Sequence, residues 1–198
     1  CAQSSAWLAE GLPALPMAVN VSGEQFRRTC LEQTVRTVLD ATRLDPAMLK
    51  LEITESVLMR DLEVTLRNLC VAREMGVRLS IDDFGTGYSS LAYLERFAIH
   101  ELKLDRSFVH NIAGGARNAA IATAVIRMAR DLSLSMVAEG VEDAQQLEQL
   151  RRLHCPHAQG YHFCRPQPAA VITALLRSAT PLPLPAAPGT GMNIAISP

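Results

Sequence analysis

Short apolar runs alternate along this chain with longer segments in which apolar residues recur every three or four positions. The short runs have the length of buried strands, and the longer segments have the period of amphipathic helices. The predicted strands are residues 17–21, 49–53, 77–81, 102–104, 135–138 and 158–161. Because strands and helices take turns along the chain, the pattern is typical of a parallel α/β sheet or barrel.

Local signals set the ends of the predicted helices. Ser22 and Gln25 have the spacing of a capping box, which opens a helix over residues 22–42. Leucines at helical spacing predict a second helix over residues 61–75, and Gly76 ends it. Each helix follows a strand directly, as expected of βα units.

Three parts are expected along the chain. Residues 1–12 read as the remnant of a helix from a missing N-terminal part, and residues 13–178 hold the strands and helices. Residues 179–198 are rich in Pro, Ala and Gly, and they contain no charged side chain and no periodicity. This last segment is predicted to be a flexible tail.

Two adjacent acids, Asp82 and Asp83, end the third apolar run, and a glycine-rich turn follows at once. Like charges this close repel each other unless a cation lies between them. Carboxylate oxygens suit Mg²⁺, Mn²⁺ or Ca²⁺. The pair therefore predicts a metal site, although a lone pair of this kind would fit an Asx-type turn better.

Every predicted strand has a polar residue at its carboxyl end. In a (β/α)8 barrel these ends converge on one face, where catalytic residues lie. One such residue carries little information, but six in register, mostly carboxylates with one lysine, indicate a site. They are Asn20, Glu52, Asp82 with Asp83, Lys103, Glu139 and Gln159.

Composition narrows the class of partner. The 198 residues carry a formal net charge of −1 and are 48% hydrophobic, so a globular domain is expected and no positive field exists to hold a polymeric nucleic acid. No apolar run is long enough to span a bilayer, and the first residues do not resemble a signal peptide. Five cysteines without CxxC spacing fit reduced thiols. The expected location is the cytoplasm, with no membrane segment in this chain.

Six ordered motifs resemble those of the bacterial EAL-domain cyclic-di-GMP phosphodiesterases, from about Trp7 to Leu176. The motifs are Val19-Asn20-Val21-Ser22, Glu52-Ile53-Thr54-Glu55, Asp82-Asp83-Phe84-Gly85-Thr86-Gly87, Lys103-Leu104-Asp105, Val137-Ala138-Glu139-Gly140-Val141-Glu142 and Gln159-Gly160-Tyr161. The resemblance implies a TIM-like (β/α) barrel that hydrolyses cyclic di-GMP to the linear dinucleotide pGpG in bacterial second-messenger signalling. It also implies two Mg²⁺ or Mn²⁺ ions.

The resemblance also implies roles for individual residues. Four of them would hold metal, with Asp82 bridging the two ions: Asn20, Glu52, Asp82 and Asp83. Lys103 and Glu139 would orient or activate the attacking water, and Gln159 would support them. In the family a glutamate anchors the loop after the aspartate pair and couples metal binding to dimer contacts. The matching residues are Glu55 and the loop residues Thr86, Gly87 and Ser89.

One part of the family pattern is absent. The Glu-Ala-Leu motif, whose glutamate completes the first metal site, is missing, and so is the arginine after it; Glu10-Gly11-Leu12 lies too close to Asn20 to replace them. Only six strands are predicted, so we expect an incomplete barrel that lacks its first strands. The full protein is expected to carry the missing part, an upstream sensor or cyclase domain, and to form a homodimer when complete.

Two other functions remain open on sequence. A non-catalytic cyclic-di-GMP receptor or protein-interaction module would share the fold, but it would be expected to have lost the metal carboxylates, which are present here. A metal-dependent barrel enzyme for another substrate is also compatible with the residues, because a fold does not fix a substrate.

Overall fold

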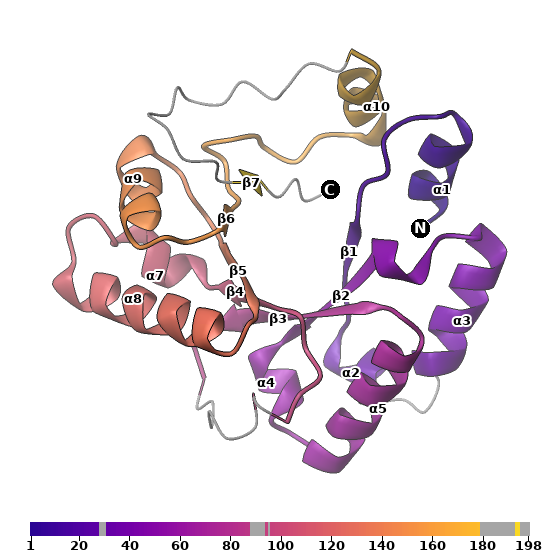
Figure 1. Ribbon diagram of the computed structural model, residues 1–198, viewed down its shortest axis with the longest axis horizontal. Coiled ribbons are helices and arrows are strands. Elements are labelled where there is room, and N and C mark those ends of the chain that lie inside the picture. The colour runs from indigo at the N-terminus through magenta and orange to yellow at the C-terminus, as the bar shows by residue number, and fades with distance from the viewer. Residues whose placement is uncertain (28–30, 88–93, 95, 179–192, 195–198) are drawn as a thin grey trace.

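The computed structural model describes residues 1–27, 31–87, 94, 96–178 and 193–194. Within these residues the strands form one parallel sheet in the order of the chain. The strands are β1 (Met17–Asn20), β2 (Leu49–Thr54), β3 (Arg78–Phe84), β4 (Glu101–Leu104), β5 (Ser135–Ala138), β6 (His157–Ala158) and β7 (Asn193–Ile194). The sheet curls but does not close, so β1 and β7 are its edges (Figure 1).

Helices follow the strands and lie outside the curled sheet (Figure 1). They are α1 (Ala2–Ala9), α2 (Gly23–Arg27), α3 (Leu31–Thr42), η1 (Pro46–Met48, a 3-10 helix), α4 (Glu55–Leu58), α5 (Leu62–Glu74), α7 (Arg106–His110), α8 (Ala116–Asp131), α9 (Ala144–Arg152) and α10 (Ala169–Ser178). The packing of α5 on β3 and of α8 on β4 and β5 makes the fold an α/β, TIM-like barrel, which is incomplete among the described residues.

Alternation along the strands separates the core from the site. Successive side chains of a strand point to opposite faces. On one face, Leu51, Leu79 and Leu102 are at most 3% exposed and pack in the main hydrophobic cluster. On the other face the same strands carry polar residues. The apolar side chains therefore pack against the helices, and the polar side chains face the candidate site.

The predicted strands are confirmed, with two differences in length. The strand expected at 77–81 is β3 and runs on to Phe84. The strand expected at 158–161 is only His157–Ala158. The chain turns after this strand at Gly160, whose φ is +154°. A Cβ atom there would collide with the Val141 backbone, so the close approach requires glycine. The helix expected at 22–42 is described as α2 and α3, and residues 28–30 between them lie outside the described residues.

Four helical elements were not predicted: the short helices α4 and α7, the 3-10 helix η1 and helix α10. Helix α10 packs against α1, where the Trp7 indole Nε1 donates a hydrogen bond to Thr173 Oγ1 (2.8 Å) and Arg177 forms an ion pair with Glu10 (2.6 Å). Strand β7 was also not predicted and lies within the expected tail. The other residues of that segment, 179–192 and 195–198, lie outside the described residues, so a flexible tail stays a prediction.

Candidate active site

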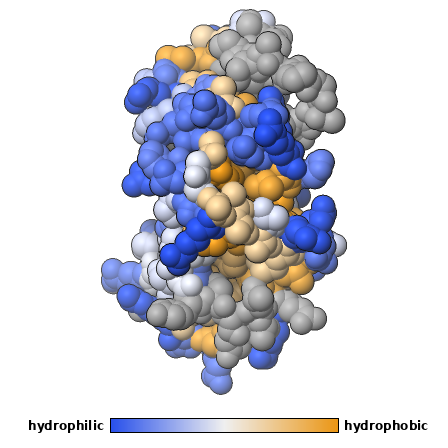
Figure 2. All heavy atoms as spheres, turned by 90° about the vertical axis from the view of Figure 1, so that its left-hand side faces the viewer, coloured by the Kyte–Doolittle hydropathy of each residue, from blue (hydrophilic) through white to orange (hydrophobic). Residues whose placement is uncertain are grey.

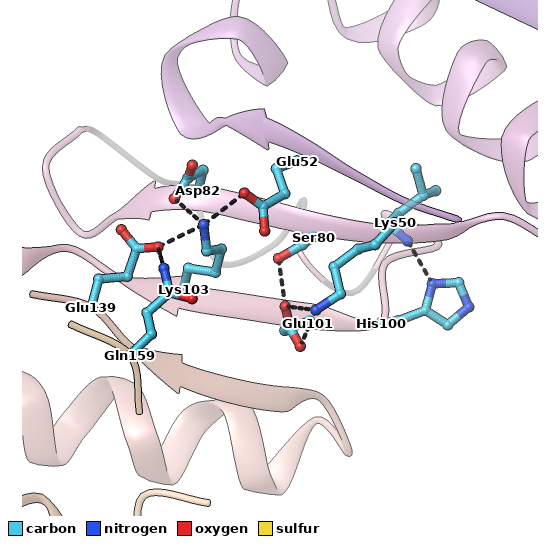
Figure 3. A network of polar contacts seen from close by, with 10 residues as sticks. Lys50, Glu52, Ser80, Asp82, His100, Glu101, Lys103, Glu139 and Gln159 are labelled. Carbon is cyan, nitrogen blue, oxygen red and sulfur yellow. Dashed lines mark hydrogen bonds and ion pairs between the residues drawn. The ribbon is translucent and has the colours of Figure 1, made fainter. Parts of the chain in front are cut away.

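The Lys103 side chain is the centre of the candidate site. Its ammonium nitrogen lies 2.8 Å from Glu52 Oε2, 3.2 Å from Asp82 Oδ1 and 2.6 Å from Glu139 Oε1 (Figure 3). The Gln159 amide donates a hydrogen bond of 2.6 Å to the same Glu139 oxygen. Five of the predicted site residues thus form one connected network at the carboxyl ends of β2 to β6.

The parallel register explains how residues so far apart in sequence meet. Asn20 pairs with Glu52 between β1 and β2. The peptide NH of Glu139 donates to Leu104 O, and that of Gln159 donates to Ala138 O, so each follows the end of a neighbouring strand. Asn20 is exposed at the end of the edge strand β1.

Asp83 reaches the site only because β3 is irregular. In a regular strand, adjacent residues such as Asp82 and Asp83 would point to opposite faces. The pairing of β3 with β4 shifts register between Ile81 and Phe84, and Asp83 adopts φ +54°, a left-handed conformation that Asp tolerates better than most residues. As a result, carboxylate oxygens of Asp82, Asp83 and Glu139 all lie within 4.8 Å of one another.

The charges of the site are strongly coupled. Burial alone would lower the pKa of Lys103, but the neighbouring Glu139 and Glu52 carboxylates raise it well above its usual value, so Lys103 stays an ammonium ion. Burial raises the pKa of Glu139 to about 7, against the lowering effect of Lys103 and with further raising effects from Asp82 and Glu52.

The aspartate pair is also perturbed. Burial, followed by the charges of Asp82 and Asp105, raises the pKa of Asp83. Such crowding of acids favours a bound cation, since a cation stabilises their charged forms. Three hard oxygen donors so close together fit a divalent ion of the Mg²⁺, Mn²⁺ or Ca²⁺ type.

Glu55 links the site to the loop after the aspartate pair. It is the first residue of α4 and is only 2% exposed. Its Oε2 accepts hydrogen bonds from the peptide NH groups of Gly85 (2.9 Å) and Gly87 (3.4 Å). A Cβ atom on Gly87 would lie 2.6 Å from Glu55 Oε1, so the close approach requires glycine.

The rest of the predicted loop is described only in part. Thr86 Oγ1 donates a hydrogen bond to Asp83 O (2.8 Å) and thereby stabilises the turn. Ser89 lies outside the described residues. Asp105 caps α7 by accepting a hydrogen bond from the Ser107 NH (2.9 Å).

A second polar layer lies beside the site and was not predicted. The Glu101 carboxylate accepts hydrogen bonds from Lys50 and Ser80, and each of the three residues lies two positions before a site residue on its own strand (Figure 3). Directly before β4, His100 accepts at Nδ1 a hydrogen bond from the Leu79 NH (3.1 Å). The signal was present in the sequence, because polar residues alternate with apolar ones in these strands.

Comparison with known proteins decides the family. The sequence profile of the EAL domain matches residues 1–166. This chain belongs to the EAL domain family. It is 48% identical over 168 residues to the cyclic di-GMP phosphodiesterase NbdA of Pseudomonas aeruginosa, covering 85% of this chain and 22% of that protein. It is 45% identical to the bifunctional diguanylate cyclase/cyclic di-GMP phosphodiesterase MucR of the same organism, covering 88% of this chain and 25% of that protein.

Solved EAL structures share the fold. The cyclic-di-GMP complex of the MucR phosphodiesterase superposes with a TM-score of 0.84 at 45% identity, over 87% of this chain and 70% of that chain. The manganese and cyclic-di-GMP complex of BlrP1 from Klebsiella pneumoniae gives 0.75 at 30% identity, over 83% and 42%. The chain spans about a quarter or less of the length of the curated relatives NbdA and MucR.

Proposed function

We propose that this EAL chain hydrolyses cyclic di-GMP to linear pGpG by a two-metal mechanism, as part of bacterial second-messenger signalling. The observation that supports this most strongly is the cluster of Lys103 with Glu52, Asp82 and Glu139 at the carboxyl ends of parallel strands. This is the face on which barrel enzymes place their chemistry. The relatives named as cyclic di-GMP phosphodiesterases support the choice of substrate.

The metal ligands proposed are Asn20, Glu52, Asp82 and Asp83. Their oxygens suit Mg²⁺ or Mn²⁺, and a related structure is a manganese and cyclic-di-GMP complex. Two such ions, when bound, lower the pKa of water and neutralise charge on the attacking and leaving oxygens of a phosphodiester.

Three other residues would act on the reacting groups. Glu139 is half-buried with a pKa of about 7, which suits a group that takes a proton from the attacking water near neutral pH. The Gln159 amide holds one Glu139 oxygen and so fixes the direction of its carboxylate. Lys103, a permanent cation, would stabilise negative charge on the phosphoryl group.

The loop held by Glu55 is proposed as a regulatory element. The complete protein is proposed to form a homodimer, to which this loop couples metal binding. Figure 2 shows an apolar area on the side of the molecule that carries α8, between hydrophilic regions. Within α8, Ala120 and Ala124 are exposed, and Ile121 and Val125 are partly exposed. An apolar helix face of this kind supports self-association.

The cellular setting of the EAL unit is the last part of the proposal. No helix among the described residues is long and apolar enough to cross a membrane. We propose that the EAL unit works in the cytoplasm beside a sensor or cyclase domain, because MucR combines a cyclase with a phosphodiesterase.

The test is conversion of cyclic di-GMP to pGpG by the whole gene product that contains these residues, with Mg²⁺ or Mn²⁺, measured by chromatography. Asp82→Ala and Lys103→Ala should each abolish most of the turnover. Asp40→Asn, which changes an exposed acid on α3, should leave it unchanged. Full activity in the Asp82 and Lys103 variants would refute the assigned roles. Tight binding without product would instead favour the receptor function.

A further inference from the structure

Two ion pairs of opposite polarity join the same two strands. Glu52 on β2 contacts Lys103 on β4, and two residues earlier Lys50 on β2 contacts Glu101 on β4. Both pairs cross β3, which lies between these strands in the sheet. Because side chains two apart on a strand share a face, the two pairs lie one layer apart (Figure 3).

The second polar layer, formed by Lys50, Ser80 and Glu101, is tightly hydrogen-bonded and largely buried. Lys50 Nζ contacts both carboxylate oxygens of Glu101, at 2.7 and 2.9 Å, and Ser80 Oγ donates a hydrogen bond of 3.1 Å to Glu101 Oε1. Ser80 is 1% exposed and Glu101 is 8% exposed. All three strands that supply Glu52, Asp82 and Lys103 are therefore connected by side chains directly beside the site.

The choice of residue type is informative. Of the 19 lysines and arginines in the chain, only Lys50 and Lys103 are lysines, and both lie on this face of the sheet. A lysine side chain carries a compact ammonium on a flexible stem, and in both pairs this ammonium reaches across β3 to a carboxylate on the other strand.

The alternating charges also fix the relative position of β2 and β4. A shift of one strand by two residues would place Lys50 beside Lys103, or Glu52 beside Glu101, and like charges in a site of low dielectric repel strongly. Only the observed register gives two attractive pairs.

We propose that Lys50, Ser80 and Glu101 are positioning residues, which hold Glu52, Asp82 and Lys103 at the spacing needed to bind divalent metal and to turn over substrate. The proposal deepens the proposed phosphodiesterase function, and its claim about substrate turnover rests on that function. The metal part stands separately, because it concerns the carboxylates themselves. Replacing residues that orient metal ligands without binding the metal themselves typically lowers metal affinity or activity by about 10- to 100-fold.

The experiment uses the whole gene product and three variants: Lys50→Met, Glu101→Gln and, as matched control, Asp40→Asn. Mn²⁺ alone is titrated and followed by electron paramagnetic resonance, and kcat and KM for cyclic di-GMP are measured well below the melting temperature. We expect the two layer variants to bind Mn²⁺ about 10- to 100-fold more weakly, or to lose kcat by that factor, with little change in KM. The control should match wild type in every measurement.

The outcomes separate the inference from the proposed function. Wild-type Mn²⁺ affinity and kcat in the layer variants, with only a lower melting temperature, would mean that the layer is merely structural and would overturn the inference. If single variants fail to fold, the double variant K50M/E101L removes both charges without leaving one unpaired and decides by the same criteria. If wild type has no activity, the proposed function fails, and Mn²⁺ binding alone decides the inference.

Discussion

Replacing Lys103 with methionine should destabilise the folded protein by removing the cation of a buried cluster. Lys103 is 4% exposed and Glu52 is 7% exposed, so water cannot replace the lost ammonium group. Removing one partner of a buried ion pair costs about 3–5 kcal/mol, because the other charge is left uncompensated. We expect K103M to lose a free energy of unfolding in this range when EDTA keeps metals away.

The loss should depend on pH, with a definite sign. The pKa of Glu139 is about 7 in the presence of Lys103, which lowers it, so without Lys103 it rises further. The folded variant then keeps a proton that the unfolded chain has released, and stability falls as pH rises. Above pH 7 the variant should therefore lose stability relative to wild type, by up to about 1.4 kcal/mol per pH unit for this one group.

Urea unfolding followed by circular dichroism, at pH 6 and pH 8.5 in EDTA, measures both effects. Arg36→Met is the matched control, because it breaks the exposed ion pair between Arg36 and Glu32. Exposed pairs contribute about 0–1 kcal/mol, so this variant should differ little from wild type at either pH. A loss in K103M no larger than in the control, or one that shrinks at the higher pH, would refute the electrostatic account of the cluster.

Three further predictions concern positions around the site and the core. Gly85→Ala should lower the free energy of unfolding in urea by about 1–3 kcal/mol, because φ is +98° and a Cβ atom would collide with the Phe108 ring. The control Gly114→Ala, where a Cβ atom meets nothing within 4 Å, should leave the free energy of unfolding unchanged. Burial, together with the charges of Arg78 and Arg73, lowers the pKa of His100 from 6.5. As pH drops below 6.5 the unfolded chain therefore takes up a proton before the folded protein does, and the free energy of unfolding falls. In His100→Gln this fall should be smaller. Burial raises the pKa of Cys155 to about 11, so at pH 8 a thiol reagent should label exposed Cys70, read by mass spectrometry, long before Cys155.

The sequence predicts the strands well because their signals are local. The apolar runs that became β1, β2 and β5 are short and bounded by capping or turn residues, and each is in place within a residue or so at each end. Proline disfavours a helix interior, so Pro166 and Pro168 hide from the sequence pattern the helix α10 that begins directly after them. In the structure Pro168 stands at the helix entrance, where its carbonyl accepts the first helical hydrogen bonds and its missing NH is not needed.

Contacts across the sheet could not be predicted in the same way. Strand periodicity places Lys50 and Glu52 on one face, but it does not say which residues of β4 they meet. That depends on the stagger of β2, β3 and β4, which only the folded sheet defines. The residues of the candidate site were therefore predictable, and its pairwise geometry was not.

Asp83 shows why the pattern of a site and its geometry are separate problems. Period-two alternation alone would turn Asp83 away from Asp82, so a regular strand of this sequence would place only one of the two acids in the site. The structure brings both in by a register shift and a left-handed residue, followed by Gly85 and a turn held by Glu55. Asp tolerates that conformation and a β-branched residue does not, so the identity of residue 83 serves the backbone as well as the charge. The adjacent acids therefore mark a place where the backbone must leave the regular strand for both carboxylates to act together.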